Sequence, residues 1–326
     1  MRLPVAPIEC VVAGDAVLSV ANRLGVLAAV GRTGGRTATD VADELGLDAA
    51  ATRVLLDALA EIEIVDRNGS KFSAHPDVPR VVRMMSTVTD ALERRVRTGE
   101  PTLSGGRPDE ASRLYEGLVG MLGTFFAEAA EEVAEQLAQP GLAILDAGAG
   151  SAPWSRAIVQ REPTCTVVAL DLPEVIDRTR QSVAEAGLED RFHYLEADVL
   201  DVDLAGEQYD LVLAANLCHL FDAATTERLI RRLVAAGRPG GSVAIIDAVP
   251  EHDGADRRRY VALYAAGLLT RTASGGVHGF SDYARWLRGA GAEAVGRYDC
   301  VAFPSTVIRA DVPRIEQSSS VRSRRR

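Results

Sequence analysis

The chain has 326 residues, of which 47% are hydrophobic and 25% are charged, and its formal net charge is −10. This length accommodates one large domain or two ordinary domains, and the composition is that of a globular protein with a buried core. Four of the last five residues are arginines, so the rest of the chain is more acidic than the total. Such an acidic body argues against a nucleic-acid partner.

Targeting signals and cysteine spacing indicate in which compartment the protein is expected. No uninterrupted apolar run reaches the roughly 18 residues of a membrane span, and the first residues lack the apolar core of a signal peptide. The cysteines at positions 10, 165, 218 and 300 are widely scattered, which predicts neither a disulfide framework nor a zinc-cysteine motif. We therefore expect a cytoplasmic protein without a membrane partner.

The N-terminal part reads as a small helical unit. Apolar residues at helical spacing predict a helix over about 12–30. Caps at 37–40 predict a short helix that runs to Leu45, and a second helix is expected after the turn at 46–48. The turn at 67–69 lies between two short apolar segments and predicts a hairpin. Helix, turn, helix and hairpin follow the order of a winged helix, which we assign to residues 1–100.

The helix after the turn at 46–48 decides what the unit could bind. A helix that reads DNA should be basic, whereas this one presents mostly acidic polar residues: Asp48, Arg53, Asp57 and Glu61. We therefore expect a dimerisation module, in a homodimer, rather than a DNA-binding domain.

The middle of the chain mixes two patterns. Residues 76–112 combine arginines with proline and glycine and predict an irregular connector. Residues 113–138 carry an apolar stripe at helical spacing, in which Phe125 or Phe126 could line a substrate pocket.

From residue 142 onward, apolar strand segments alternate with helical ones, which predicts an α/β fold with a Rossmann-like, doubly wound sheet. We assign residues 101–315 to this domain and expect a disordered tail at 316–326. The expected strands lie at 142–146, 166–170, 192–197, 210–215 and 242–247, with one or two more near 292–309.

A glycine turn follows the first of these strands. Asp146, Gly148 and Gly150 form an Asp-x-Gly-x-Gly motif, and glycines there let the backbone turn tightly against a ligand. A dinucleotide-binding turn needs a third glycine where this chain has Pro153. Asp171, after the second strand, suits a ribose diol. This ordered set indicates an S-adenosylmethionine site, with the NAD-dependent dehydrogenases as a less favoured alternative.

The third strand also ends in a carboxylate, Asp198, which suits the edge of an adenine ring. The candidate cofactor-binding residues are Asp146, Gly148, Gly150, Asp171, Leu172, Asp198, Val199 and Asn216.

These motifs resemble, in the same order, those of the S-adenosylmethionine-dependent O-methyltransferases of the caffeate and acetylserotonin type and their bacterial relatives. The matching segments are 146–150, 171–175, 197–198, 216–219, 238–241 and 242–247. The resemblance covers about residues 12–310. It implies an interlocked dimer formed by the winged helix, a cofactor site at Gly148, Asp171 and Asp198, and a catalytic base at His219.

The same resemblance draws attention to Asp247 and His278. Many family members carry two acidic residues flanking the catalytic histidine. Asp247 fits the first, but His278, after Gly275-Gly276-Val277, stands where a glutamate is usual. If the fold brings His219, Asp247 and His278 together, two imidazoles and a carboxylate form a facial metal triad for zinc, iron, manganese or nickel.

Three functions follow from these residues. A bound metal would suit C-methylation of a 2-oxo acid at its β-carbon, with His219, Asp247 and His278 as ligands and catalytic residues. Without a metal, His219 would serve as general base for the O-methylation of a hydroxylated metabolite. A methyltransferase-like protein that binds the cofactor without transferring methyl is the third possibility.

Overall fold

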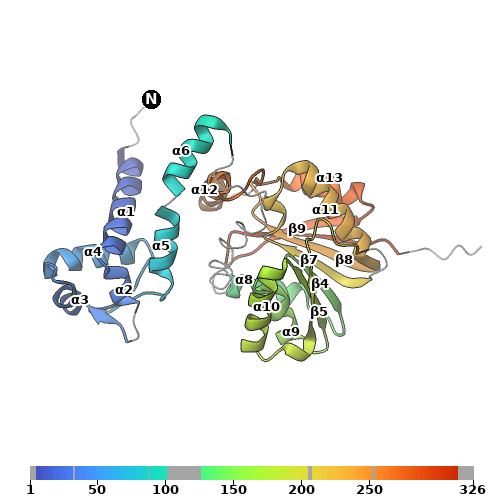
Figure 1. Cartoon of the computed structure of the whole chain (residues 1–326), viewed down its shortest axis with the longest axis horizontal. Helices are drawn as coiled ribbons and strands as arrows, with labels where there is room; N and C mark the ends of the chain where they lie inside the picture. Colours follow the sequence, from blue (N-terminus) through green and yellow to red (C-terminus); the bar gives the residue numbers. More distant parts are fainter. Residues whose placement is uncertain are drawn as a thin grey trace, which may run out of the picture. The chain divides into compact units, whose positions relative to one another are not determined.

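The computed structural model describes residues 5–31, 34–86, 88–100, 126–204, 208–251 and 254–314. The chain divides into two compact units, Met1–Glu93 and Arg94–Arg326, each of which is described by itself (Figure 1). The expected helical positions 113–125, Phe125 among them, and the tail at 316–326 lie outside the described residues. None of the helices within those ranges is both long and apolar enough to cross a membrane.

The N-terminal unit combines short helices with a small antiparallel sheet in the order β1-β3-β2. The predicted helix over 12–30 is two helices, because Gly25 adopts a left-handed φ of 79° and interrupts it. The elements are α1 (Val5–Arg23), α2 (Val26–Val30), β1 (Arg36–Thr37), α3 (Ala38–Leu45), α4 (Ala49–Glu61), β2 (Asp66–Asn68), β3 (Lys71–Ser73) and α5 (Val78–Ser86).

Polar caps fix where α3 and α4 begin. Thr37 and Asp40 form a reciprocal capping box at the start of α3. The Asp48 side chain accepts a hydrogen bond from the backbone N–H of Ala51, at 2.7 Å, at the start of α4. The buried Leu56 of α4 belongs to the same apolar core as Phe72 of β3. The expected helix–turn–helix and hairpin are therefore both present.

The irregular connector predicted from residue 76 onward is wrong for its first part. The helices α5 and α6 (Val88–Thr98) occupy much of it. Pro79 lies in the first turn of α5, where a missing N–H costs nothing. Val78 and Val82 pack against the unit's core, so burial of one helix face outweighs the proline signal.

The C-terminal unit is built on a seven-stranded sheet in the order β6-β5-β4-β7-β8-β10-β9. Strands β6, β5, β4, β7 and β8 are parallel, and β10 runs antiparallel to both β8 and β9. The elements are α8 (Ala127–Leu137), β4 (Ala143–Ala147), α9 (Pro153–Arg161), β5 (Thr166–Asp171), α10 (Pro173–Glu185), η1 (Glu189–Arg191), β6 (Phe192–Glu196), β7 (Tyr209–Ala215), η2 (Cys218–Leu220), α11 (Ala223–Ala236), β8 (Gly237–Asp247), α12 (Ala255–Arg271), α13 (Phe280–Gly289), β9 (Glu293–Asp299) and β10 (Thr306–Asp311).

Helices cover both faces of this sheet, which confirms the predicted Rossmann-like α/β architecture (Figure 1). The inward residues of α8 and α9 share one apolar core, and those of α11 and α13 share the other. Strand β7 is buried along its whole length, as expected of a central strand covered on both sides. The sheet order changes direction at β4, which lies between β5 and β7, and ligands of such sheets bind at that point.

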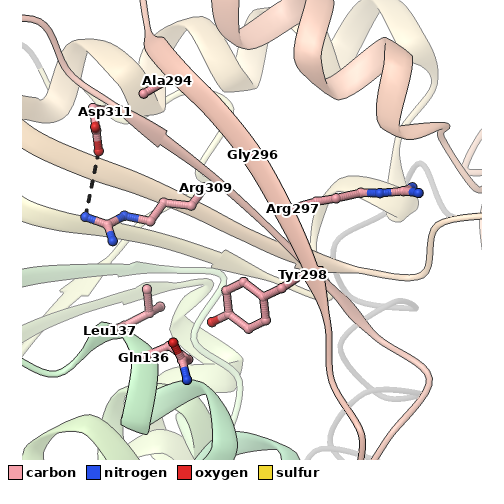
Figure 2. A pocket seen from close by; sticks show the side chains of 8 residues that line it. All are labelled: Gln136, Leu137, Ala294, Gly296, Arg297, Tyr298, Arg309 and Asp311. Carbon is pink, nitrogen blue, oxygen red and sulfur yellow. Dashed lines mark ion pairs between the residues drawn. The ribbon is translucent and has the colours of Figure 1, made fainter.

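A pocket of about 380 Å³ lies between the C-terminal end of α8 and the strands β9 and β10 (Figure 2). Its polar lining includes Gln136, Tyr298 and Arg309, and Arg309 pairs with Asp311 at 3.7 Å. None of the residues expected in the active site lines it. The chemistry expected of this chain therefore has to be sought elsewhere, at the carboxyl ends of the parallel strands.

Candidate active site

Four adjacent parallel strands carry polar residues at or next to their carboxyl ends. Asp146 is the penultimate residue of β4, Asp171 ends β5, Asn216 follows β7 and Asp247 ends β8. These strands are neighbours in the sheet, so the four residues lie along one edge. The crevice of a doubly wound sheet opens at this edge.

The glycine turn after β4 is tightly packed. Gly148 has a φ of 70°, and a Cβ added there would lie 2.8 Å from the Leu217 side chain. A larger residue would therefore be strained and would also clash. Pro153 is the first residue of α9, which explains why proline replaces the third glycine of a dinucleotide site: here that position begins the helix.

Asp171 is fixed by the turn that it faces. Its Oδ2 accepts a hydrogen bond from the Gly150 N–H and its Oδ1 accepts one from the Leu172 N–H, both at 2.8 Å. Burial raises the pKa of Asp171, these two backbone donors lower it in part, and the nearby charge of Asp198 raises it further. The structure thus brings Gly150, Asp171 and Leu172 together, as a cofactor site requires.

The other expected cofactor residues lie at the same edge of the sheet. Asp198 follows β6 and accepts a hydrogen bond from the Leu200 N–H at 2.8 Å, and Val199 beside it is buried. Asn216 adopts a left-handed φ of 53°, which asparagine tolerates better than most residues. Its N–H donates to the Ile246 carbonyl at 2.8 Å.

Asp146 is buried and bonded to the helix that follows the glycine turn. Its Oδ2 accepts a hydrogen bond from the Ser155 hydroxyl of α9 at 2.5 Å. Burial raises the pKa of Asp146 to about 6, although the Ser155 bond lowers it, and the charge of Asp171 adds to the increase. Asp146 therefore links β4 to α9 through its bond to Ser155. Its buried carboxyl group is costly to ionise.

Replacing Asp146 with asparagine should remove this cost. The pKa of Asp146 is raised from its ordinary 3.8 to about 6 in the folded protein. As the pH rises through this window, ionisation of the buried carboxyl group destabilises the fold. The penalty is fully present at pH 7 and amounts to roughly 3 kcal/mol. We expect Asp146→Asn to unfold at higher urea concentration than the wild type at pH 7.

Urea unfolding at a series of pH values checks this prediction. The advantage of Asp146→Asn over the wild type should shrink between pH 6 and pH 4. A constant difference across that range would show that Asp146 is not the group that titrates.

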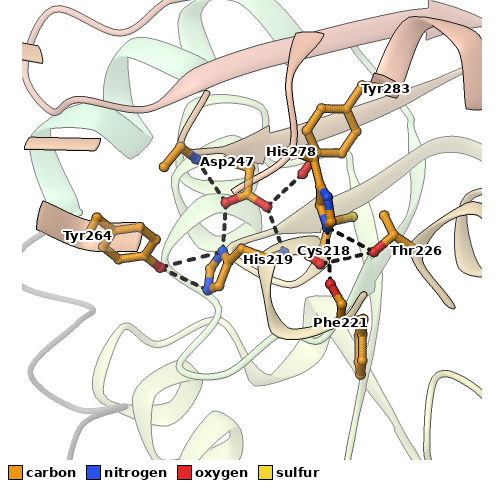
Figure 3. A network of polar contacts seen from close by, with 9 residues as sticks. Cys218, His219, Phe221, Thr226, Asp247, Tyr264, His278 and Tyr283 are labelled. Carbon is orange, nitrogen blue, oxygen red and sulfur yellow. Dashed lines mark hydrogen bonds and ion pairs between the residues drawn. The ribbon is translucent and has the colours of Figure 1, made fainter. Parts of the chain in front are cut away.

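His219 and Asp247 form a buried pair between η2 and the end of β8 (Figure 3). The distance between His219 Nδ1 and Asp247 Oδ1 is 2.6 Å, and the two residues are only 4% and 0% exposed. The short helix η2 directs His219 back toward β8, where its backbone N–H also donates to Asp247 Oδ2 at 3.1 Å. This is the predicted juxtaposition of the two residues.

Four donors hold the Asp247 carboxylate. Its Oδ1 accepts from His219 Nδ1 and from the Ala248 N–H, and its Oδ2 accepts from the His219 N–H and the Tyr283 hydroxyl. Burial alone would raise the pKa of Asp247, but the His219 ring and the other donors outweigh it and hold that pKa below its usual range. An ionised Asp247 can only accept, so Nδ1 carries the hydrogen and Nε2 of the neutral ring is an acceptor.

His278 has other hydrogen-bond partners, and these contacts do not support the expected metal triad. Its Nε2 lies 3.1 Å from the Phe221 carbonyl oxygen and 3.2 Å from Thr226 Oγ1 (Figure 3). A carbonyl can only accept, so this nitrogen carries a hydrogen and is not a free metal ligand. Its ring packs edge-on against Tyr283 and Trp286. Among the described residues, no group of three or more His, Cys, Asp and Glu could hold a metal ion.

Two tyrosines at the pair were missed by the sequence analysis. Tyr283 of α13 donates to Asp247 Oδ2 at 3.0 Å, and Tyr264 of α12 lies 2.9 Å from His219 Nε2. The hydrogen-bonded chain thus runs from Tyr283 through Asp247 and His219 to Tyr264. Nothing in the spacing of these tyrosines along the sequence indicates that they meet at one histidine.

The glycine pair before His278 packs on the backbone of His219. The Gly276 N–H donates to the His219 carbonyl at 3.0 Å. A Cβ added to Gly275 would lie 2.3 Å from that same oxygen, whereas one added to Gly276 would meet nothing within 4 Å. Gly275 is therefore required for the loop to approach the histidine.

A series of aromatic contacts leads from the glycine turn toward this pair. Trp154, which follows the turn, lies 5.4 Å from Phe126, and Phe126 lies 4.9 Å from Phe303, as measured between ring centroids. Phe303 contacts Tyr260, which stacks on Tyr264. Trp154 and Phe126 are both buried in the core. The pocket role expected for Phe126 stays a prediction.

Comparison with known proteins decides the family. The model of the O-methyltransferase domain matches residues 121–293, more than half of the chain. The chain belongs to this family. It is therefore a methyltransferase that uses S-adenosylmethionine.

Individual relatives are similar over different lengths. Mitomycin biosynthesis 6-O-methyltransferase from Streptomyces lavendulae is 24% identical over 319 residues, which cover 89% of each chain. L-tyrosine C(3)-methyltransferase from the same organism is 29% identical over 149 residues, 45% of this chain and 40% of that protein. Bovine acetylserotonin O-methyltransferase is 27% identical over 129 residues, 40% of this chain and 36% of that protein.

Solved structures share the fold over nearly the whole chain. An O-methyltransferase family protein from Burkholderia thailandensis superposes with a TM-score of 0.70 at 20% identity, covering 97% of this methyltransferase and 100% of that chain. Human N-acetylserotonin methyltransferase in complex with S-adenosylmethionine gives a TM-score of 0.69 at 19% identity, covering 96% and 99%.

Proposed function

We propose that this methyltransferase transfers a methyl group to a hydroxyl group of a small molecule, with His219 as general base. The observation that carries the proposal is the buried contact of 2.6 Å between His219 Nδ1 and Asp247 Oδ1. It fixes the tautomer in which Nε2 can accept a proton, at the edge of the sheet where substrates of this fold bind.

The residues around the glycine turn fit S-adenosylmethionine. Each oxygen of Asp171 accepts one backbone N–H and retains a lone pair, as two ribose hydroxyls require. The absence of a Cβ at Gly148 lets the turn take its left-handed conformation and pack against Leu217. When bound, the cofactor supplies an electrophilic methyl group on its sulfonium. We propose that Asp171 binds the ribose and Asp198 the adenine. The rest of the cofactor site would be lined by Gly148, Gly150, Leu172, Val199 and Asn216, and Asp146 would support the glycine turn.

The chain's own residues would perform the proton transfer. A substrate hydroxyl would donate to His219 Nε2 and give up its proton there as its oxygen attacks the methyl group. The ring would then carry a positive charge, which the buried Asp247 carboxylate stabilises. Tyr283 and the Ala248 N–H keep that carboxylate in place throughout.

A methyl-transfer assay tests the proposal. Purified protein and S-adenosylmethionine are incubated with a panel of phenols, hydroxylated polycyclic compounds and 2-oxo acids, and the products are identified by mass spectrometry and NMR. We expect an O-methyl product from at least one hydroxyl compound. A product methylated only at carbon, as the name of the L-tyrosine C(3)-methyltransferase describes for that relative, would contradict O-methylation but keep the enzyme class.

The contacts of His278 do not favour metal-dependent methylation of 2-oxo acids. Its Nε2 is within hydrogen-bond distance of the Phe221 carbonyl and of Thr226 Oγ1. The same assay with EDTA addresses this alternative. We expect the rate of O-methylation to be unchanged by chelator, whereas loss of activity that a divalent ion restores would revive the metal site.

We further propose that the N-terminal unit is a winged helix through which two chains form a homodimer. The order α3, α4 and the β2–β3 hairpin, with β1 completing a three-stranded sheet, supports the first part. Exposed apolar residues in this unit support the second: Leu24, Val54 and Ile62. Sedimentation equilibrium of the full chain should give twice the monomer mass, and a monomer at micromolar concentration would contradict dimer formation.

A further inference from the structure

The hydroxyl group of Tyr264 contacts the face of the proposed base that has no carboxylate. Its oxygen lies 2.9 Å from His219 Nε2 and 3.5 Å from His219 Nδ1 (Figure 3). The two rings meet edge to face, with centroids 5.3 Å apart and planes at 84°. Tyr264 is therefore in direct contact with the nitrogen to which a substrate proton would go.

The two distances show from which direction Tyr264 approaches. The lone pair of an imidazole nitrogen points outward in the plane of the ring, so a partner on that axis would lie about 5 Å from the other nitrogen. The Tyr264 oxygen is much closer to Nδ1 than this, at 3.5 Å. The hydroxyl thus contacts Nε2 from the side and does not occupy the axis along which a substrate hydroxyl would donate.

The Tyr264 ring also contacts two other side chains. Its ring stacks on Tyr260 with centroids 5.9 Å apart and an interplanar angle of 16°. The Arg271 guanidinium lies 4.9 Å from the centre of the Tyr264 ring. Tyr260 is in turn supported edge-on by Phe303. A tyrosine packed in this way is a fixed contact for the imidazole.

We propose that Tyr264 is a positioning residue of the methyl transfer, an inference that rests on the proposed role of His219 as base. Asp247 holds the imidazole at Nδ1, and the Tyr264 hydroxyl holds it at Nε2, so the ring keeps the orientation in which its lone pair faces the substrate. Because the hydroxyl lies beside the ring and off the Nε2 axis, it can restrain the imidazole without occupying the position through which the substrate proton arrives. The substrate proton passes directly to Nε2 and does not pass through Tyr264.

The variant Tyr264→Phe tests this role because it keeps the ring and removes only the hydroxyl. We expect kcat for an accepted hydroxyl substrate to fall about tenfold, the effect of losing one hydrogen bond of ordinary strength. The KM and the dissociation constant of S-adenosylmethionine should stay within about twofold of the wild type, as for a group that binds neither ligand. The matched control is Tyr298→Phe on the edge strand β9, which removes a tyrosine hydroxyl outside the proposed site, and its kcat should be unchanged.

Two further measurements separate positioning from other roles. In ¹⁵N-labelled protein without substrate, the Nε2 resonance of His219 should shift in Tyr264→Phe and not in Tyr298→Phe. Single-turnover rates in mixtures of H₂O and D₂O should fall linearly with deuterium content, as for one proton in flight. A bowed dependence would show a relay through Tyr264 and overturn the proposal, as would a wild-type kcat in Tyr264→Phe.

The proposal about Tyr264 can fail independently of the proposed function. If the wild type methylates no hydroxyl compound, O-methylation fails, and the ¹⁵N measurement still decides whether Tyr264 contacts the His219 ring. An unchanged Nε2 resonance in Tyr264→Phe, with an active wild type, would overturn the positioning role alone.

Discussion

His219→Ala should lower kcat for methyl transfer by about 10²- to 10⁴-fold, the usual contribution of a general base. The loss falls on kcat because the side chain removed is the one proposed to take the substrate proton. Binding of S-adenosylmethionine should persist, since Asp171 and the glycine turn do not depend on the His219 ring. Steady-state kinetics for the turnover and isothermal titration calorimetry for the cofactor measure the two effects.

A matched control for this variant is His193→Ala. His193 lies in β6 of the same sheet and is exposed, so its removal should leave kcat and cofactor affinity unchanged. If His219→Ala kept more than a tenth of the wild-type kcat, with the fold and cofactor binding intact, His219 would not be the base.

Asp247→Asn should lower kcat by about 10³-fold or more, because the carboxylate no longer fixes the tautomer of His219 in which Nε2 is free to accept a proton. Each oxygen of Asp247 accepts two hydrogen bonds, from His219 Nδ1 and the Ala248 N–H on one side and from the His219 N–H and the Tyr283 hydroxyl on the other. Whichever way the asparagine amide is turned, its NH₂ group faces donors. Pre-steady-state kinetics give the rate, and urea unfolding gives the accompanying loss of stability.

The comparison variant is Asp256→Asn. Asp256 lies on α12 with a side chain that is 95% exposed, so its ion pair with Arg259 contributes little. It should match the wild type in both measurements. Equal kcat values for Asp247→Asn and the wild type would show that the carboxylate does not determine the protonation of His219.

The parallel half of the sheet could be predicted from the sequence because its strands are buried on both faces. Strand β7 is apolar from Leu211 to its end. Polar residues come at or after the ends of β5 and β8, so Asp171 and Asp247 could be assigned to one edge. Strand β9 is largely exposed and lies at the edge of the sheet. Its sequence therefore has no continuous apolar run from which the ends of the strand could be predicted.

The missed part of the site depends on packing between distant elements. Tyr264 and Tyr283 reach the His219–Asp247 pair from α12 and α13, and no local pattern specifies the angle at which those helices pack. His278 was expected beside His219 because it occupies the usual position of a second acidic residue in related enzymes. The Phe221 carbonyl and the aromatic rings of α13 provide it with other partners.

The close approach of residue 275 to the carbonyl of His219 has a consequence for protein engineering. The loop that precedes α13 is a natural place to randomise residues when a methyltransferase is to accept a new substrate. At position 276 a library can introduce any small side chain, since free space surrounds it, but at position 275 every change would push the base out of line. Two adjacent glycines that look equivalent in the sequence would therefore give opposite outcomes in directed evolution.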